Sequence, residues 1–271
     1  MIKILKNYKL DKKNILLTGA AGLLGKQFSK ALLEAGGNVI LTDINEKGLL
    51  QLEKNLLKKY KQRNIKCFKL DVTSEKSIVN LVKKLGQKKI KLDALINNAC
   101  LDPKYEKKMK SKNNSLENFS LNIWDDEIKV GLTGSFLCAK HFGYQMKRNK
   151  KNGVIINIGS ELSVVAPDQR IYKKNFFKPV TYSVIKHGII GLTKYLSTYW
   201  AEYGIRCNAL SPGGVFNNQD KKFLRNFKRL VPLNRMANQD EYNSAIQFLC
   251  SDASKFLNGH NLIIDGGRSI W

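Results

Sequence analysis

The sequence is poor in the features that mark disordered, secreted or membrane-spanning proteins. Proline accounts for only 5 of 271 residues while hydrophobic residues make up 43%, so a large core is possible and long disorder is not expected. The longest uncharged apolar stretches fall well short of the ~18 residues that a membrane-spanning helix needs. Lysines interrupt the apolar residues of the N-terminal MIKILKNYKL, which makes it a poor signal peptide. We therefore expect a cytoplasmic protein with no membrane partner.

Cysteine and histidine are too few and too scattered to predict a disulfide framework or a metal site. The five cysteines are odd in number and lack CxxC spacing, so they are interpreted as reduced thiols of an intracellular protein. The three histidines lie far apart in the sequence and belong to no pattern of metal ligands, so no metal is expected.

Acidic residues are also scarce, since 22 Asp and Glu stand against 47 Lys and Arg, a net charge of +25. A charge of that size ordinarily raises the question of nucleic-acid binding. However, only 8 of the basic residues are arginine, and the lysines are spread along the whole chain. No helix-turn-helix, aromatic RNA-binding signature or zinc finger accompanies them. The charge therefore predicts no specific nucleic-acid site and is compatible with an anionic small-molecule substrate.

Short apolar runs alternate with longer helical patterns, which is typical of βαβ units around a parallel sheet. Strands are predicted at Asn14–Thr18, Asn38–Thr42, Ile65–Leu70, Leu92–Ile96, Val154–Ile158, Ile205–Leu210 and Leu262–Ile264. Helices are predicted near 23–36, 45–62, 74–87, 122–149, 181–203 and 239–250. The pattern predicts an α/β fold over residues 1–271: one Rossmann-type, doubly wound parallel sheet of about seven strands, flanked by helices.

Two segments interrupt this alternation and are expected to be substrate loops. Residues 101–121 are rich in Lys and Asn, and residues 164–180 are mixed basic and aromatic. Both follow the carboxyl end of a predicted strand, where open α/β sheets bind ligands. A third irregular stretch, Ser211–Asn218, follows the sixth strand in the same way.

The first strand runs directly into a glycine-rich segment that predicts a dinucleotide site. Glycines permit a tight turn and a close approach of the backbone to a pyrophosphate, and the helix that follows supplies N–H groups and a favourable dipole. The alternative is a glycine-rich strand-to-helix turn that binds nothing. The candidate cofactor-binding residues here are Thr18, Gly19, Gly22, Leu23, Leu24 and Gly25.

Carboxylates and amides after the next three strands extend this candidate site. Asp43 follows the second strand and favours NAD over NADP, because its carboxylate can accept hydrogen bonds from ribose hydroxyls and repels a 2′-phosphate. It can equally be a helix cap before Glu46. Asp71 with Val72 can contact the adenine, although Asp71 is also a plausible helix start. Asn98 and Ala99 close the fourth strand and are expected beside the ribose.

The helix predicted from Thr181 carries Tyr182 and Lys186 with i, i+4 spacing, so the phenol and the ammonium share one face. An ammonium near a phenol stabilises the phenolate, which allows a tyrosine to act as a base or acid near neutral pH. Ser160 ends the fifth strand, where its hydroxyl can bond a substrate oxygen. We take Ser160, Tyr182 and Lys186 as the candidate catalytic residues.

Together these motifs resemble the short-chain dehydrogenase/reductase family over essentially the full chain. The resemblance includes TGAAGLLG at 18–25, the NNA at 97–99, Ser160 with Tyr182 and Lys186, SPGG at 211–214 and DGG at 265–267. Within the family, the phrases GLTGSFLCAK, APDQR, KPVTYSVIKHG and LSPGGV are most similar to bacterial flagellin-modification oxidoreductases, which are associated with surface-sugar pathways.

The resemblance implies an NAD-dependent dehydrogenase that acts on a carbinol or ketone, with a sugar phosphate or nucleotide sugar as the expected substrate. Tyr182 would move the hydroxyl proton, Lys186 would hold the nicotinamide ribose, and Ser160 would orient the substrate oxygen. Pro212, Gly213 and Val215 would wrap the nicotinamide. It also implies a homotetramer or homodimer, with the helices after strands four and five as the interface.

Three departures from the family pattern stand out. The loop spacing is G-x-x-G-x-x-G, Ser160 and Tyr182 are unusually far apart, and Gly131 replaces an Asn that helps hold a proton-relay water. Gly131 supports a second hypothesis, an NAD-binding sensor or scaffold protein with little turnover. Arg170 either binds a substrate anion or pairs with Asp168 or Glu161.

Overall fold

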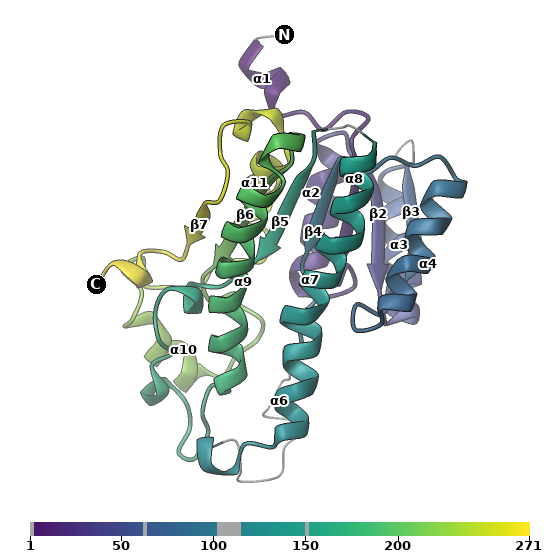
Figure 1. Cartoon of the computed structure of the whole chain (residues 1–271). Helices are drawn as coiled ribbons and strands as arrows, with labels where there is room; N and C mark the ends of the chain where they lie inside the picture. The colour runs from purple at the N-terminus through teal and green to yellow at the C-terminus, as the bar shows by residue number, and fades with distance from the viewer. Residues whose placement is uncertain (1–2, 62–63, 102–114, 150–151) are drawn as a thin grey trace.

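The centre of the computed structural model, which describes residues 3–61, 64–101, 115–149 and 152–271, is a parallel β-sheet (Figure 1). Within these residues it has seven strands in the order β3-β2-β1-β4-β5-β6-β7, and each neighbouring pair is parallel. The predicted doubly wound sheet is thus confirmed. The strands are β1 Asn14–Thr18, β2 Asn38–Asp43, β3 Ile65–Lys69, β4 Ala94–Asn97, β5 Val154–Ile158, β6 Arg206–Pro212 and β7 Asn261–Ile264.

Successive side chains of each strand point to opposite faces of the sheet, so the continuously apolar central strands supply two cores. Ile15 and Leu17 of β1 belong to one buried cluster, which also contains residues of α2 (Leu23–Glu34), α3 (Glu46–Lys59) and α11 (Asn243–Cys250). Leu16 belongs to the other, with residues of α4 (Glu75–Gln87) and α9 (Val180–Tyr199). Helices accordingly cover both faces of the sheet (Figure 1).

The helix predicted near 122–149 is continuous but not uniformly α-helical. It consists of α6 (Leu121–Ile128), α7 (Gly134–Cys138) and α8 (Tyr144–Arg148), joined by the π-helical turns η2 (Lys129–Thr133) and η3 (Ala139–Gly143). The helix packs beside α9 over one face of the sheet (Figure 1). No helix among the described residues is both long and apolar enough to cross a bilayer.

Several short elements were not predicted. They are α1 (Lys3–Asn7) and α10 (Lys221–Lys228), together with the 3-10 turns η1 (Leu116–Asn118), η4 (Glu161–Ser163), η5 (Gln169–Ile171), η7 (Asp252–Ser254) and η8 (Arg268–Ile270). The turn η6 (Ala201–Tyr203) lies within the helix predicted near 181–203, whose α-helical part ends at Tyr199. The most consequential is α10, because η5 and α10 pack together through a separate small cluster of Ile171, Phe227, Val231 and Met236. Of the two predicted loops, 164–180 is described, whereas most of 101–121 lies outside the described residues.

The strand order places the ligand site. The chain winds outward from β1 through β2 to β3 and then returns to β4 on the other side of β1. The connections after β1 and β4 therefore leave the sheet toward opposite faces, and a crevice opens at the carboxyl ends of these strands. The loops that follow β1, β2, β4, β5 and β6 meet at this edge.

Candidate active site

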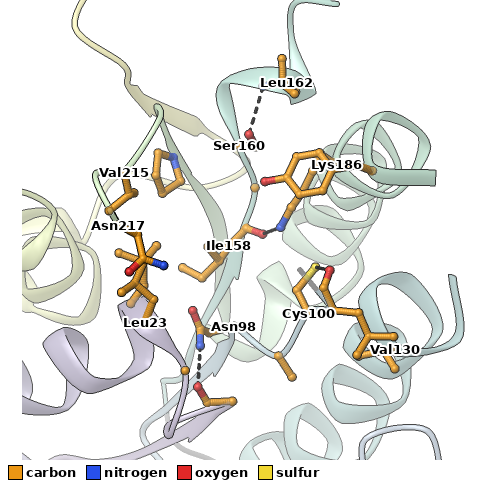
Figure 2. Close-up of a pocket in the computed structure, with 18 of the residues that line it drawn as sticks. Leu23, Asn98, Cys100, Val130, Ile158, Ser160, Leu162, Lys186, Val215 and Asn217 are labelled. Atoms are coloured by element: carbon orange, nitrogen blue, oxygen red, sulfur yellow. Dashed lines mark hydrogen bonds between the residues drawn. The ribbon is translucent and has the colours of Figure 1, made fainter. Parts of the chain in front are cut away.

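A cavity of about 640 Å³ occupies the carboxyl edge of the sheet and collects most of the predicted site residues. In Figure 2, Leu23, Val215 and Asn217 lie on one side of it, and Lys186, Cys100 and Val130 on the other. The predicted residues that line it are Gly19, Gly22, Leu23, Leu24, Asp43, Asp71, Val72, Asn98, Ala99, Ser160, Tyr182, Lys186, Pro212, Gly213 and Val215. Thr18 and Gly25 lie outside this lining.

Thr18 and Gly25 do not line the cavity but hold the glycine loop in place. Thr18 is buried, and its hydroxyl accepts the backbone N–H groups of Asn98 (3.0 Å) and Ala99 (3.1 Å). A Cβ on Gly25 would lie 2.2 Å from the carbonyl oxygen of Gly19, a distance that no side chain tolerates. The tight packing of loop against helix therefore requires glycine at this position.

Gly19 and Asn98 fix the loop against β4. Gly19 has φ +64°, and a Cβ there would lie 2.8 Å from the Cα of Ala99. The Asn98 amide donates hydrogen bonds to the carbonyls of Thr18 and Gly19, both at 3.0 Å, and Figure 2 draws one of the two. Asn98 was expected beside a ribose, and the structure also gives its side chain a bracing role. The preceding Asn97 is buried and donates to Asn157 of β5 at 2.8 Å.

The start of α2 fits an anionic group. Gly22 is its N-cap, no side chain caps the helix, and its first turn contains no acidic residue. Gly22, Leu23 and Leu24 line the cavity at this end. The N–H groups and dipole of an uncapped helix start favour phosphate, so these residues would hold a dinucleotide pyrophosphate.

Asp43 and Asp71 hold the neighbouring turns. The Asp43 carboxylate accepts the N–H of Ala21 at 2.9 Å and that of Asn45 at 2.8 Å. Asn45, and not Asp43, is the N-cap of α3, so the helix-cap alternative for Asp43 is wrong. Asp71 accepts the backbone and hydroxyl donors of Thr73, and the cap of α4 is Ser74. Each carboxylate oxygen has two lone pairs, so both residues retain acceptor capacity toward the cavity.

Tyr182 and Lys186 lie on the first turns of α9, as the i, i+4 spacing predicts. The Lys186 ammonium lies 5.6 Å from the centroid of the Tyr182 ring. It donates to the carbonyl oxygen of Ile158 at 2.9 Å (Figure 2), which anchors the buried ammonium to the end of β5. Ser160 follows two residues later, and its Oγ accepts the N–H of Leu162 at 3.2 Å, so the hydroxyl proton remains available to a substrate oxygen.

A buried carboxyl group adjoins Ser160. Burial raises the pKa of Glu161 to about 7, against the opposing effect of the Arg268 guanidinium. The two side chains are both nearly buried, and Arg268 Nε lies 3.8 Å from Glu161 Oε1. Of the alternatives for Arg170, the structure shows the pairing with Asp168, through two hydrogen bonds of 2.9 and 2.8 Å, while Glu161 faces Arg268. Arg170 is exposed and does not line the cavity.

Sequence reasoning missed the walls on the substrate side of the cavity. Tyr172 comes from the 164–180 segment, Phe223 and Phe227 from α10, and Asn217 and Gln219 from the segment between β6 and α10. These residues share no motif, and only long-range packing brings them together. The positions of the irregular stretches after β5 and β6 were the one available signal.

The cysteines differ sharply in surroundings. Cys100 lines the cavity and is partly exposed. Burial raises the pKa of Cys67, Cys138 and Cys250 to about 12, and it raises the pKa of Cys207 as well. These four thiols are therefore protonated and poorly reactive at neutral pH.

Gly131 lies in the π-helical turn η2 and faces α9. A Cβ at this position would lie 2.8 Å from Cγ2 of Ile185. Ile185 is buried and directly precedes Lys186, so its branched side chain fills the space that a larger residue 131 would need. The small residue at position 131 and the large residue at position 185 are therefore complementary in volume.

Comparison with known proteins identifies the family. A model described as enoyl-(acyl carrier protein) reductase matches residues 19–269. The chain belongs to the short-chain dehydrogenase/reductase family. It is 30% identical to an NAD-dependent glycerol dehydrogenase of Listeria innocua, over 98% of this chain and 97% of that protein. It is also 30% identical to a D-threitol dehydrogenase of Mycolicibacterium smegmatis (97% and 95%) and to post-translational flagellin modification protein A of Campylobacter coli (96% and 100%).

Solved structures of similar dehydrogenases agree with this assignment, and they include one with bound NAD⁺ and one with bound NADP. A short chain dehydrogenase from Leptospira borgpetersenii with bound NAD⁺ is 31% identical, with a TM-score of 0.80 over 97% of this chain and 94% of that one. A gluconate 5-dehydrogenase from Burkholderia cenocepacia, in complex with NADP and tartrate, is 26% identical with a TM-score of 0.86 over 98% of each chain. The present protein is thus an NAD(P)-dependent oxidoreductase.

Proposed function

We propose that this protein is an NAD-dependent dehydrogenase that interconverts a secondary alcohol and a ketone on a sugar derivative. The observation that carries the proposal is the convergence of Ser160, Tyr182 and Lys186 on one cavity whose opposite end is the uncapped glycine loop. The nicotinamide, which would exchange the hydride, and Tyr182, which would exchange the proton, then occupy different parts of the same cavity.

Each catalytic side chain has a distinct task. When bound, the nicotinamide supplies the hydride acceptor for oxidation and the hydride donor for reduction. The Ser160 hydroxyl donates to the substrate oxygen and orients it. Tyr182 accepts the proton of the substrate hydroxyl, and Lys186 stabilises the phenolate that this requires. Because Ile158 anchors Lys186, the ammonium is already in position before the substrate binds.

Asp43 supports NAD as the preferred cofactor. Its carboxylate borders the cavity beside the glycine loop and ties the loop to the β2–α3 turn. A 2′-phosphate placed there would meet a negative charge. The glycine loop, Asp71, Val72, Asn98 and Ala99 would surround the rest of the adenosine and the pyrophosphate, and Pro212, Gly213 and Val215 the nicotinamide.

An anionic sugar, either a sugar phosphate or a nucleotide sugar, is the proposed substrate, with a surface-glycan pathway of the flagellin type as its setting. The names of the glycerol, threitol and flagellin-modification relatives support a hydroxylated substrate. Lys178 lines the cavity together with the catalytic residues, and the chain carries a net charge of +25. Both favour a substrate of negative charge.

We further propose that the protein is a homodimer or homotetramer built through the long α6–α8 helix and α9. These helices expose Phe136, Tyr144, Tyr195 and Tyr199, with 47%, 55%, 61% and 58% of each residue accessible. Apolar and aromatic side chains gathered on neighbouring helices are typical of a subunit interface. Trp271 is also 75% exposed, and its indole donates a hydrogen bond to the carbonyl of Leu230.

The second candidate is an NAD-binding sensor with little turnover. The observation behind it is Gly131, which offers no side chain for a proton relay and whose space Ile185 occupies. The intact set of Ser160, Tyr182 and Lys186 favours the enzyme.

The deciding experiment measures NADH formation by the purified protein with NAD⁺ and a panel of polyols, sugar phosphates and nucleotide sugars. A 2-enoyl thioester with NADH covers the acyl substrate class that the family description names. Tyr182→Phe should lower turnover at least about 100-fold and leave NAD affinity unchanged, whereas Tyr195→Phe, an exposed tyrosine of the same helix, should do neither. NAD binding without turnover on any substrate would support the sensor, and absence of NAD binding would refute both candidates.

A further inference from the structure

A second lysine, Lys178, lies against the ring of Tyr182, and no sequence motif predicts this contact. The Lys178 ammonium lies 3.7 Å from the centroid of the Tyr182 ring, closer than that of Lys186 at 5.6 Å. An ammonium over the face of a tyrosine ring makes a cation–π contact. The same position is within Coulombic reach of the phenol oxygen, where a positive charge favours the ionised form.

The backbone of Lys178 is held where this contact requires. Its N–H donates to Gln169 Oε1 at 2.8 Å, and its carbonyl accepts Gln169 Nε2 at 3.4 Å. One amide side chain thus binds both polar groups of a single residue. Pro179 follows as the N-cap of α9 and restricts Lys178 to extended conformations. Lys178 thus lies four residues before Tyr182, at the end of the segment that separates Ser160 from Tyr182.

Few other described charges face this tyrosine. Lys186 lies on its own helix, anchored to Ile158. Glu161 of η4 borders the same cavity, and burial raises the pKa of its carboxyl to about 7, so near neutral pH this group is only partly ionised. Glu127 of α6 accepts a hydrogen bond from Thr181, the residue before Tyr182. Of all these charged groups, the ammonium groups of Lys178 and Lys186 are the two that contact the ring.

We propose that Lys178 is a positioning residue for catalysis, a second cation that acts together with Lys186 to stabilise the phenolate form of Tyr182. It acts through Tyr182 and needs no contact with the reacting atoms. Loss of either positive charge raises the pH at which Tyr182 ionises, because the phenolate then loses part of its electrostatic support. The inference rests on the proposed function for its effect on turnover, although its electrostatic basis can be tested without turnover.

The first test titrates Tyr182 directly. The phenolate absorbs in the near ultraviolet, and the difference between the full-length protein and its Tyr182→Phe variant isolates the signal of this one tyrosine. Lys178→Met should move the midpoint upward by about one pH unit, Lys178→Arg should restore it, and Lys186→Met serves as the positive control. Lys174→Met removes a charge from an exposed position of the same loop and should leave the midpoint in place. An unchanged midpoint in Lys178→Met would overturn the proposal.

The second test follows kcat/KM for alcohol oxidation against pH. In Lys178→Met the rise with pH should shift upward by about one unit, with about a tenfold loss below both midpoints and recovery of the wild-type value at high pH. An increase in KM for anionic substrates with no shift in the pH midpoint would overturn the proposal and assign Lys178 to substrate binding alone. If no substrate is turned over, the proposed function fails while the titration still decides the role of Lys178.

Discussion

The two halves of the cavity are built by different means. In the cofactor half, comprising residues 18–25 with Asp43, Asp71 and Asn98, backbone groups and short side chains form hydrogen bonds within and between the turns that follow neighbouring strands. In the substrate half, comprising residues 160–186 and α10, aromatic side chains, a buried carboxyl group and two lysines come together from distant segments. The first half is built from motifs that the sequence displays, whereas most of the second half depends on long-range packing.

The largest expected effect tests whether the cofactor half depends on exact backbone packing. Gly25→Ala brings a Cβ to 2.2 Å from the Gly19 oxygen and 2.8 Å from Ala20, so the loop must move. We expect NAD affinity to fall about 100-fold, or about 3 kcal/mol, as measured by calorimetric titration. Gly86→Ala is the matched control, because nothing lies within 4 Å of its Cβ. Equal NAD affinities in the two variants would show that the loop is adaptable.

A smaller effect is expected from the buried carboxyl group of the substrate half. The pKa of Glu161 is raised from 4.5 to about 7 by burial, so the folded protein holds this proton more tightly than the unfolded chain. Its contribution to stability is therefore present below about pH 4.5 and is lost as the pH rises through about 7. From pH 5 to 8, wild-type stability should fall relative to Glu161→Gln by about 2 kcal/mol, as measured by urea unfolding. Parallel pH profiles would mean that Arg268 fully compensates the charge.

Phe227→Ala tests whether the substrate half of the cavity can be altered without changing cofactor binding in the other half. Phe227 belongs to the small cluster with Ile171, and it also contacts Gly214. We expect kcat/KM for the substrate to fall about tenfold, while NAD affinity changes much less. Phe256→Ala, which truncates a fully exposed ring, should leave both unchanged. An equal loss of NAD affinity would show that the halves act as one unit.

The smallest effect concerns cofactor choice. Asp43→Ala should weaken NAD binding about fivefold, or about 1 kcal/mol, and reduce the preference over NADP, as measured by the ratio of kcat/KM values for the two cofactors. Asp125→Ala, an exposed change on α6, is the control. A wild-type preference for NADP would contradict the assignment of Asp43 to the ribose.

The same division explains what could be predicted from the sequence. The sheet followed from apolar periodicity, and β1 and β5 were predicted with their observed bounds, because buried parallel strands form continuous apolar runs between turn residues. The glycine loop and the Tyr182–Lys186 pair were visible because their chemistry needs close sequence spacing.

Apart from Ser160, Tyr182 and Lys186, the substrate half could not be predicted in this way. Nothing near Lys178 in the sequence indicates that Gln169 will hold its backbone or that its ammonium will lie over Tyr182. The pairing of Gly131 with Ile185 likewise depends on how two helices pack. The helix α10 was missed because its eight residues, KKFLRNFK, carry only a short apolar face, and its packing against the 164–180 segment provides the stabilisation that its length does not.

Because the five thiols differ in their surroundings, Cys100 can serve as a site for chemical labelling of the cavity. Cys100 lies in the cavity wall, whereas burial keeps Cys67, Cys138, Cys207 and Cys250 protonated. A maleimide dye should therefore attach first at Cys100, and a molecule lodged beside it should slow that attachment. The rate at which Cys100 is alkylated then measures how far the cavity is occupied. It can be followed for any compound that the protein binds, coloured or not.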